Sequence, residues 1–536
     1  MAVSTAGGRR GMHRFDVVDV TLPEIWASHA RRDPDKPALV CDGQVLSWRE
    51  FNSAMNRLAN ALIGAGVGKG DRVAVLVSSS IDACVAMFGT VKSGAVMVPV
   101  SGMLTSDQVL TLLSDCAASF VIASADLRPL VDAIADRLPA LHKDGRIGTD
   151  FDGGGWIGLG DFCAQAESAE PEVTLHGDDV FSIMYSSGTT GLPKGVVHTH
   201  AARVYFCLSN GFEMRFDGLA RSLVTTALYT AGTWLVVMPT LFAGGTLHIH
   251  RQFRAEGFLH TLEAERITHT FTVPSQIHVI LAGDGFAARD LSALKMMLSA
   301  GSPLRPDVKA HLIGLIGARF FELYGFTEGS STLLRPEDQL RKPLSVGTPL
   351  MGQELAIVDG EGRQCGPDEP GEIVGRGPGL LREYHGKATE TQAAIWRDAA
   401  GRTFIRSGDV GRLDAEGFLY ILDRKKDMII SGGLNIYPTD LEAVVGTHPE
   451  VLDVTVVGIE HEKWGETPLA VVVLRDGARV SAEVLLDWAN ARLAKHQRLC
   501  RIDLRETLPR NALGKVLKRE LRDEYRRTPP ASGAAA

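Results

Sequence analysis

The sequence has few cysteines for its length, and none of them stands at a metal-binding or redox spacing. Seven cysteines are scattered over 536 residues, and no two form a CxxC motif. An odd number of cysteines in a long chain argues against a disulfide framework and is typical of a reducing compartment. We therefore expect a cytoplasmic protein without structural disulfides.

Long hydrophobic runs and an excess of basic residues are also absent. No apolar stretch reaches the roughly 20 residues that cross a bilayer, because Lys92 and several glycines interrupt the nearest candidate, residues 84–100. Residues 1–15 are partly basic but lack the apolar segment of a secretory signal. With 56 basic and 64 acidic side chains, the net charge is −8, which does not favour a nucleic-acid binder. We expect no membrane span and no nucleic-acid partner.

The apolar pattern predicts an α/β fold with more than one domain. A chain of 536 residues exceeds one ordinary core. In its first part, segments with helical spacing of apolar residues, such as 47–65 and 81–91, alternate with short apolar runs such as 72–77 and 120–123. This alternation predicts parallel sheets covered by helices. Strands dominate after about residue 340, and an α+β pattern follows the charge cluster at 423–427, where we place a domain boundary.

The most informative stretch runs from Tyr185 to Gly195 and reads YSSGTTGLPKG. It combines glycines and hydroxyls, among them Thr189 and Thr190, with one cation, Lys194. Such a loop offers backbone N–H groups, hydroxyl donors and positive charge to a polyphosphate. It is not the common nucleotide loop, which needs Ser or Thr directly after the lysine. A flexible surface loop is the alternative interpretation of this stretch alone.

Four later segments carry weaker signals. YGFTE ends in Thr327 and Glu328, and a glutamate is an oxygen ligand suited to Mg²⁺. The aspartate of SGD, Asp409, can accept hydrogen bonds from two ribose hydroxyls. IISGGLNIYP at 429–438 has paired glycines that permit close passage of a thin ligand, and PRNALGK ends in Lys515. Each segment alone is equally consistent with a plain turn or a solvated side chain.

A possible metal pair, His198 and His200, is rejected. Both histidines follow the glycine-rich loop, and no cysteine or further histidine completes a ligand set. We expect these two side chains to pack inside the protein.

Taken together, the segments and DRKKD at 423–427 resemble the class I adenylate-forming superfamily in order and in approximate spacing, from about residue 20 to about residue 525. This superfamily includes acyl- and aryl-CoA synthetases, firefly luciferase and the adenylation domains of peptide synthetases. The pattern is most similar to that of acid–CoA ligases. The resemblance implies that ATP, Mg²⁺ and CoA serve a reaction in two halves. A carboxylic acid and ATP give acyl-AMP and pyrophosphate, and a thiol then gives a thioester and AMP.

The resemblance also refines the expected fold. Residues 1–424 would form a large N-terminal AMP-binding domain of stacked, mostly parallel βα sheets plus a small β-barrel-like part. Residues 425–536 would form a small mobile α+β domain that turns about a hinge at Lys426. The tail, 528–536, is expected to be disordered. The sequence leaves open whether the protein forms a homodimer.

Individual roles follow from the same resemblance. Lys515 would bridge the substrate carboxylate and the α-phosphate, with Thr327 on the α-phosphate and Glu328 on Mg²⁺. The remaining nucleotide and CoA contacts implied by the resemblance are Thr189, Thr190, Lys194, Tyr324, Asp409, Arg424, Gly433 and Trp464. For Trp464, an ordinary surface position is the alternative.

The acid itself is less well defined by the sequence. The implied pocket residues are Tyr229, Thr230, Ala300, Gly301, Ser302 and Gly325. Many relatives have a histidine where this chain has Tyr229, so no relative's substrate is carried over. Amino-acid-activating relatives have an aspartate about where Thr230 stands, and a buried ammonium needs such a partner. We expect an aromatic or medium-chain aliphatic acid. Two alternatives to a CoA ligase are an enzyme that loads a separate carrier protein and a non-catalytic binding protein.

Overall fold

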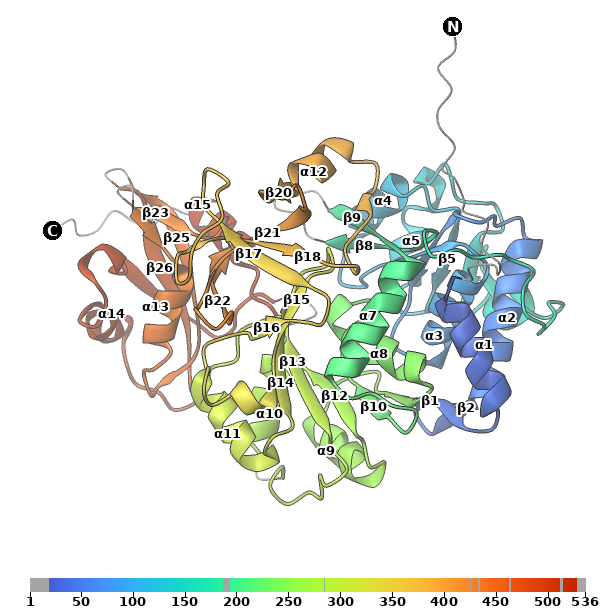
Figure 1. Ribbon diagram of the computed structural model, residues 1–536, viewed down its shortest axis with the longest axis horizontal. Helices are drawn as coiled ribbons and strands as arrows, with labels where there is room; N and C mark the ends of the chain where they lie inside the picture. Colours follow the sequence, from blue (N-terminus) through green and yellow to red (C-terminus); the bar gives the residue numbers. More distant parts are fainter. Residues whose placement is uncertain are drawn as a thin grey trace, which may run out of the picture.

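The structure, a computed structural model, describes residues 19–186, 193–283, 285–424, 426–431, 434–461, 464–510 and 514–527. Figure 1 shows a large N-terminal part on the right and a smaller C-terminal part, in orange and red, on the left. The N-terminal part contains two large mixed sheets and one small antiparallel sheet, and the C-terminal part has a sheet of its own.

The first large sheet has eight strands in the order β19-β9-β8-β4-β3-β5-β6-β7. Six of them pair in parallel, whereas β9 and β19 run antiparallel to their neighbours at one edge. The strands are β3 Arg72–Leu76, β4 Val96–Pro99, β5 Phe120–Ala123, β6 Arg146–Gly148, β7 Ile157–Gly158, β8 Val180–Ser186, β9 Lys194–Thr199 and β19 Glu383–Tyr384.

The second large sheet has nine strands in the order β16-β15-β14-β13-β12-β10-β11-β1-β2. Its central strands are parallel, and β2, β15 and β16 are antiparallel additions at the edges. The strands are β1 Pro37–Cys41, β2 Gln44–Ser47, β10 Arg221–Val224, β11 Thr246–Ile249, β12 His269–Thr272, β13 Met296–Ala300, β14 Phe320–Gly325, β15 Ser331–Leu334 and β16 Thr348–Pro349.

Helices lie between these two sheets and on both outer faces. One apolar cluster joins both sheets through buried helix residues such as Trp26, Phe51 and Trp234. Separate clusters bury the opposite face of each sheet. The result is a stack of five layers, α-β-α-β-α. The helices of the N-terminal part are α1 Leu22–Arg32, α2 Trp48–Gly64, α3 Ile81–Lys92, α4 Ser106–Asp115, α5 Arg128–Asp132, α6 Leu159–Phe162, α7 His200–Glu213, α8 Ala231–Ala243, α9 Ala255–Ala264, α10 Pro274–Leu281, α11 Pro306–Ile316 and α12 Ala388–Ala393.

Local sequence explains the two helices that define the middle layer. Ser47 caps α2, because its Oγ accepts from the Glu50 N–H while the Glu50 carboxylate accepts from the Ser47 N–H at 2.8 Å. Helix α8 is different, since every residue from Thr233 to Leu241 is buried. A helix that is apolar on all sides has to be covered on all sides, as it is between the two sheets.

The small antiparallel sheet corresponds to the expected β-barrel-like part. It has five strands, with β22 pairing on β21 beside β20. The strands are β17 Glu354–Val358, β18 Gly371–Arg376, β20 Ile395–Arg397, β21 Thr403–Leu413 and β22 Leu419–Arg424. Strand β22 ends at the charge cluster and leads into the C-terminal part.

The C-terminal part is an α+β unit with its own core. Strands β23 to β26 are antiparallel, and β27 joins β26 in parallel. Two apolar clusters fill the unit. Among the described residues, each apolar cluster of the protein lies entirely before or entirely after the charge cluster. The elements are β23 Ile429–Ser431, β24 Leu434–Ile436, β25 Val451–His461, β26 Gly465–Leu474, β27 Arg501–Arg505, α13 Pro438–Val445, α14 Ala482–Asn490 and α15 Lys518–Arg527.

The predicted fold class is confirmed: the protein is an α/β protein with parallel sheets and a smaller C-terminal α+β unit. The expected helices at 47–65 and 81–91 appear as α2 and α3, and 72–77 and 120–123 appear as β3 and β5. All seven cysteines are free. The boundary at residue 424 stays a prediction, and the tail, 528–536, lies outside the described residues.

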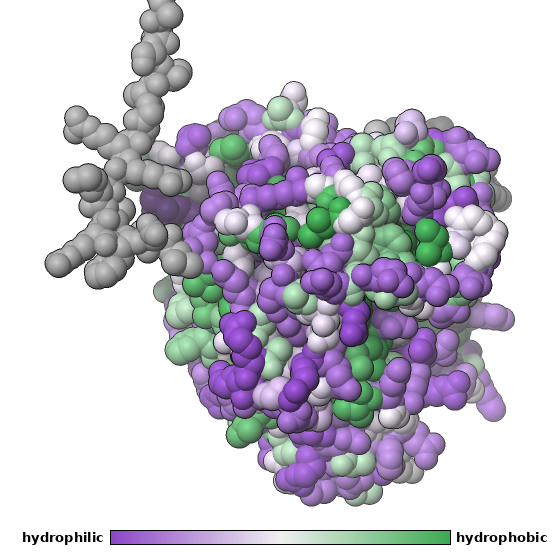
Figure 2. Space-filling model, turned by 90° about the vertical axis from the view of Figure 1, so that its right-hand side faces the viewer, coloured by the Kyte–Doolittle hydropathy of each residue, from purple (hydrophilic) through white to green (hydrophobic). Residues whose placement is uncertain are grey.

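The surface seen in Figure 2, on the side of the molecule where α1 and α2 lie, is mostly hydrophilic, with hydrophobic residues in separate small patches. Within the described residues, no helix has both the length and the apolar character that a bilayer crossing requires.

The middle layer predicts a clear difference between two positions of α2. Phe51 is fully buried in the cluster that joins both sheets, whereas Ile63 of the same helix is 36% exposed. Phe51→Ala is therefore expected to destabilise the N-terminal part by about 3–5 kcal/mol, and Ile63→Ala by much less. Urea unfolding followed by circular dichroism measures both. Equal shifts in the two variants would contradict this packing.

Candidate active site

The candidate site lies where parallel strands of the nine-stranded sheet end. Strands β13 and β14 pair in parallel, with Ala300 beside Leu323, so the segments that follow both strands emerge at the same edge. Ala300 is the last residue of β13 and is followed by Gly301 and Ser302, and Tyr324 and Gly325 end β14. Ligands of open α/β sheets bind beyond the carboxyl ends of the strands. This edge is therefore the expected place for a nucleotide and an acid.

The carboxylate of Asp409 links the large sheet to the small antiparallel sheet. Tyr324 Oη donates a hydrogen bond of 2.8 Å to Asp409 Oδ2, and Arg424 Nε lies 3.5 Å from Asp409 Oδ1. Asp409 and Arg424 are also register partners on β21 and β22. Burial and the adjacent Asp409 charge raise the pKa of Tyr324 well above its usual value, so Tyr324 keeps its proton as a donor. The predicted ribose ligand and its predicted neighbours thus form one group.

Glu328 has a second polar group around it. Tyr384 Oη donates a 2.7 Å hydrogen bond to Glu328 Oε1, and Lys194 Nζ lies 4.8 Å from the centre of the Tyr384 ring. Burial raises the pKa of Glu328, while the Tyr384 hydrogen bond and the Lys194 charge lower it. Thr327 precedes Glu328 in the same half-buried turn after β14. The structure therefore brings Lys194 and Glu328 together through a tyrosine.

Lys515 reaches this site from the C-terminal part. Burial and, to a lesser degree, the Arg424 charge lower the pKa of Lys515 to about 8, against the opposing effect of the Asp409 charge. The preceding Gly514 has a φ of +73°, and a Cβ built there would lie 2.8 Å from Ser275 Oγ of α10. Gly514 thus lies close to α10 of the N-terminal part, and the Lys515 amine lies near the Asp409 group.

The predicted acid-pocket residues line the same sheet edge. Tyr229 and Thr230 follow β10, which lies two strands away from β13. Tyr229 is half-buried, and burial raises the pKa of its hydroxyl. The Thr230 hydroxyl donates to the Ala227 carbonyl at 2.9 Å and lies 2.7 Å from Thr233 Oγ1. Ala300 is buried, and Gly301 and Gly325 are exposed.

The remaining predicted residues fall into two groups. Lys426 is exposed, and its carbonyl accepts a 3.1 Å hydrogen bond from Arg522 Nη1 of α15. Trp464 is 47% exposed. Thr189, Thr190 and Gly433 lie outside the described residues, and their predicted roles remain predictions.

The histidines behind the glycine-rich loop are packing residues, as expected. His198 and His200 are both buried, and Arg203 Nη2 lies 3.0 Å from His198 Nδ1. Burial lowers the pKa of both rings, so they are neutral near pH 7. Among the described residues, no three His, Cys, Asp or Glu side chains form a metal cluster.

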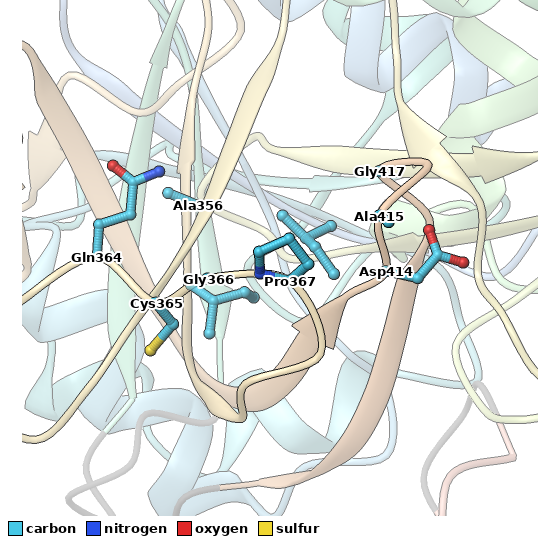
Figure 3. Close-up of a pocket in the computed structure, with 10 residues that line it drawn as sticks. Ala356, Gln364, Cys365, Gly366, Pro367, Asp414, Ala415 and Gly417 are labelled. Atoms are coloured by element: carbon cyan, nitrogen blue, oxygen red, sulfur yellow. The ribbon is translucent and has the colours of Figure 1, made fainter.

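A separate hollow of about 260 Å³ lies in the small sheet, between the turns at 364–367 and 414–417 (Figure 3). Its carboxylate, Asp414, already forms a 2.7 Å ion pair with Lys342. The hollow contains none of the site residues described above, and we assign it no role.

Sequence comparison identifies the class of protein that has this fold and site. The AMP-binding enzyme family matches residues 26–385, and its C-terminal domain matches residues 440–515. The chain belongs to this family of ATP- and AMP-binding enzymes, within the class I adenylate-forming superfamily that its motifs resemble.

Two curated relatives show the range of activities among similar proteins. A long-chain-fatty-acid–CoA ligase of Mycobacterium tuberculosis is 36% identical over 498 residues, which cover 90% of this chain and 94% of that protein. A fatty acid–[acyl-carrier-protein] ligase of Streptomyces coeruleorubidus is 30% identical over 523 residues, which cover 94% of this chain and 96% of that protein.

Solved structures support the same fold and distinguish two states of one relative. ATP-bound MatB from Rhodopseudomonas palustris is 27% identical and superposes with a TM-score of 0.85, covering 94% of this chain and 99% of that one. Its apo form, with the same identity and coverage, gives a TM-score of 0.75. The present arrangement of the chain is thus closer to the ATP-bound state.

Sequence reasoning missed Tyr384 and Asp423. Tyr384 enters the site because β19 pairs with β9, which places Tyr384 beside Val196. The segment EYHG around it has no chemical pattern that links it to Glu328. Asp423 belongs to the DRKKD motif, but its contact partner Thr439 can be identified only from the structure.

The Tyr384 hydrogen bond can be tested directly. Tyr384→Phe keeps the ring beside Lys194 but removes the donor to Glu328. A hydrogen bond to a charged group contributes about 1.5–3 kcal/mol, so we expect kcat/KM for ATP–pyrophosphate exchange to fall about tenfold or more, with a higher Mg²⁺ requirement. Tyr525→Phe removes a similar tyrosine–carboxylate bond, to Asp503 at 2.6 Å in the C-terminal part, and is the matched control. Equal activity of both variants would exclude this role of Tyr384.

Proposed function

We propose that this protein is an AMP-forming carboxylic acid–CoA ligase. The observation that carries the proposal is the convergence of the Lys515 amine and the Asp409–Tyr324–Arg424 group, which come from different parts of the chain. Together they provide one cation for an anionic reaction centre and one carboxylate for a ribose.

In the first half-reaction, a carboxylate oxygen attacks the α-phosphorus of ATP, and the bond to the β-phosphate breaks to release pyrophosphate. Both partners are anions, so cations must lie where negative charge gathers. Lys515 would neutralise the carboxylate and the α-phosphate, with the Thr327 hydroxyl on the same phosphate. Lys194, Thr189 and Thr190 would hold the outer phosphates, and Asp409 the ribose hydroxyls.

Glu328 suits the proposed Mg²⁺ site. This ion is usually held by one or two carboxylates together with substrate phosphates, so a single half-buried glutamate is a sufficient protein ligand. The Tyr384 donor and the Lys194 charge favour its ionised form. When bound, Mg²⁺ would offset negative charge on the phosphates.

In the second half-reaction, the sulfur of a thiol attacks the acyl carbonyl carbon, and the bond to the AMP oxygen breaks. We propose that the C-terminal part turns about Lys426 between the two steps and withdraws Lys515. The segment around Gly433 would then line the path of the thiol, with Trp464 near CoA. The higher similarity to ATP-bound than to apo MatB supports assigning the present arrangement to the first step.

The substrate is proposed to be an aromatic or medium-chain aliphatic acid. Thr230 offers no charge that could pair with an amino group, and its hydroxyl is already engaged by Ala227 and Thr233. Tyr229 adds a half-buried aromatic surface. The free cysteines support a cytoplasmic location.

A separate carrier protein is the second candidate for the thiol, because one relative is a fatty acid–[acyl-carrier-protein] ligase. A screen of aryl and aliphatic acids for AMP release, with CoA and with carrier protein, separates the two. Release that requires CoA supports the ligase proposed here, and release that requires only the carrier supports the alternative. Absence of pyrophosphate exchange with every acid would overturn both.

Lys515 is expected to act in only one half-reaction. Lys515→Ala should lower pyrophosphate exchange by about a hundredfold or more, because a preorganised charge at the reaction centre is lost. Thioester formation from preformed acyl-AMP should stay within about threefold of the wild-type rate. Lys495→Ala, at an exposed lysine of the same domain, is the control. Equal losses in both half-reactions would contradict the assignment.

The pH profile supplies an independent test of the Lys515 charge. Its pKa of about 8 means that the amine loses its proton, and hence its positive charge, as pH rises through 8. Since kcat/KM reports groups of the free enzyme, kcat/KM for exchange should decline above about pH 8. In Lys515→Arg the guanidinium keeps its charge at these pH values. This variant is expected to be slower overall because of its changed geometry, but its kcat/KM should not decline above pH 8. The same decline in the arginine variant would refute the assignment.

A further inference from the structure

Two hydrogen bonds connect the end of the large domain to the first helix of the small one. The Thr439 N–H donates to Asp423 Oδ2 at 3.3 Å, and the Thr439 hydroxyl donates to the Leu422 carbonyl. Leu422 and Asp423 belong to β22, before Lys426, and Thr439 belongs to α13, after it (Figure 1). Both bonds thus connect residues on opposite sides of Lys426.

Helix α13 depends on this contact for its amino-terminal turn. Its N-cap residue, Tyr437, makes no side-chain capping bond, and Pro438 has no N–H to donate. Thr439 is the second residue of the helix, a position whose N–H is normally satisfied by an N-cap side chain. Asp423 supplies that acceptor from the other domain, and its negative charge suits the positive end of the helix.

The surroundings of Asp423 make the contact specific to one arrangement of the domains. Asp423 is 5% exposed, and its Oδ1 also accepts from the Arg424 N–H at 2.6 Å. Burial raises the pKa of Asp423 to about 6, and the charges of Glu442 and Asp427 add to this rise. The charge of Lys518, which pairs with Glu442 at 2.8 Å, acts in the opposite direction and favours the ionised carboxylate. Both Lys518 and Glu442 lie in the C-terminal part, so a rotation of this part would remove them from Asp423.

We propose that Asp423 and Thr439 form a latch that holds the small domain in the arrangement of the first half-reaction. The proposal rests on the proposed function, in which this domain turns about Lys426. Rotation must break both bonds and expose the amino-terminal turn of α13 and the Asp423 carboxylate. Asp423 and Thr439 are not among the residues proposed to bind the reactants. Both are positioning residues, which act by holding Lys515 in place.

The test compares the two half-reactions in Asp423→Ala and in Thr439→Val. Valine has nearly the shape of threonine and removes only the hydroxyl bond to Leu422. In both variants we expect the ratio of pyrophosphate exchange to thioester formation from acyl-AMP to fall about tenfold, because exchange slows while thioester formation is unchanged or faster. Thr439→Ser, which keeps the hydroxyl, should restore the wild-type ratio.

Ser481→Ala is the matched control. Ser481 caps α14, another helix of the C-terminal part, by accepting from the Val484 N–H at 3.3 Å. Removal of this cap should lower the unfolding temperature of the C-terminal part without changing the ratio of the half-reactions. A ratio that stays unchanged in Asp423→Ala, or that falls equally in Ser481→Ala, would overturn the latch.

Small-angle X-ray scattering separates failure of the latch from failure of the proposed function. Asp423→Ala should shift the scattering profile of the ligand-free protein, whereas Ser481→Ala should leave it unchanged. A wild-type protein inactive in both half-reactions would refute the function, and the scattering comparison would still decide the latch. An unchanged profile in Asp423→Ala overturns it.

Discussion

The proposed site depends on a buried amine, that of Lys515, which can neutralise anionic reactants only while it keeps its charge. Burial and Arg424 both disfavour the charged form of Lys515, and Asp409 favours it. With a pKa of about 8, the amine is mostly protonated at neutral pH. Anionic phosphate and carboxylate groups would raise this pKa, since opposite charge favours the charged form of an amine, and would thereby offset the unfavourable burial.

The proposed withdrawal of Lys515 between the two half-reactions would explain why the two parts of the chain are joined by polar contacts. Each part has its own apolar clusters, and among the described residues no cluster includes members from both sides of the charge cluster. The contacts between them include the hydrogen bond from Thr439 to Asp423 and the close approach of Gly514 to Ser275. A shared apolar core would hold the domains permanently, because separating it would expose large apolar area to water. A few hydrogen bonds can be exchanged for bonds to water at small net cost.

The elements predicted from sequence are those whose environment is local. The runs at 72–77 and 120–123 are apolar throughout because both faces of β3 and β5 are covered, and their positions could be predicted within one residue. The group of Tyr384, Glu328 and Lys194 could not, because it depends on the pairing of β9 with β19, which are far apart in the chain. The motifs indicated the residues that we propose to bind nucleotide, but not Tyr384, which donates a hydrogen bond to one of them.

The same distinction applies to the charge cluster at 423–427. In sequence it is a short run of three basic residues between two aspartates, which is equally typical of a solvated turn. In the structure its members separate: Asp423 is buried against α13, Lys426 is exposed, and Asp427 is buried in a 2.8 Å ion pair with Arg522 of α15. Asp423 and Asp427, on either side of the exposed Lys426, both have partners in the C-terminal part, Thr439 and Arg522. If Lys426 is the proposed hinge, its exposed side chain can move at small cost, whereas the contacts of Asp423 with Thr439 and of Asp427 with Arg522 fix the backbone on either side of it.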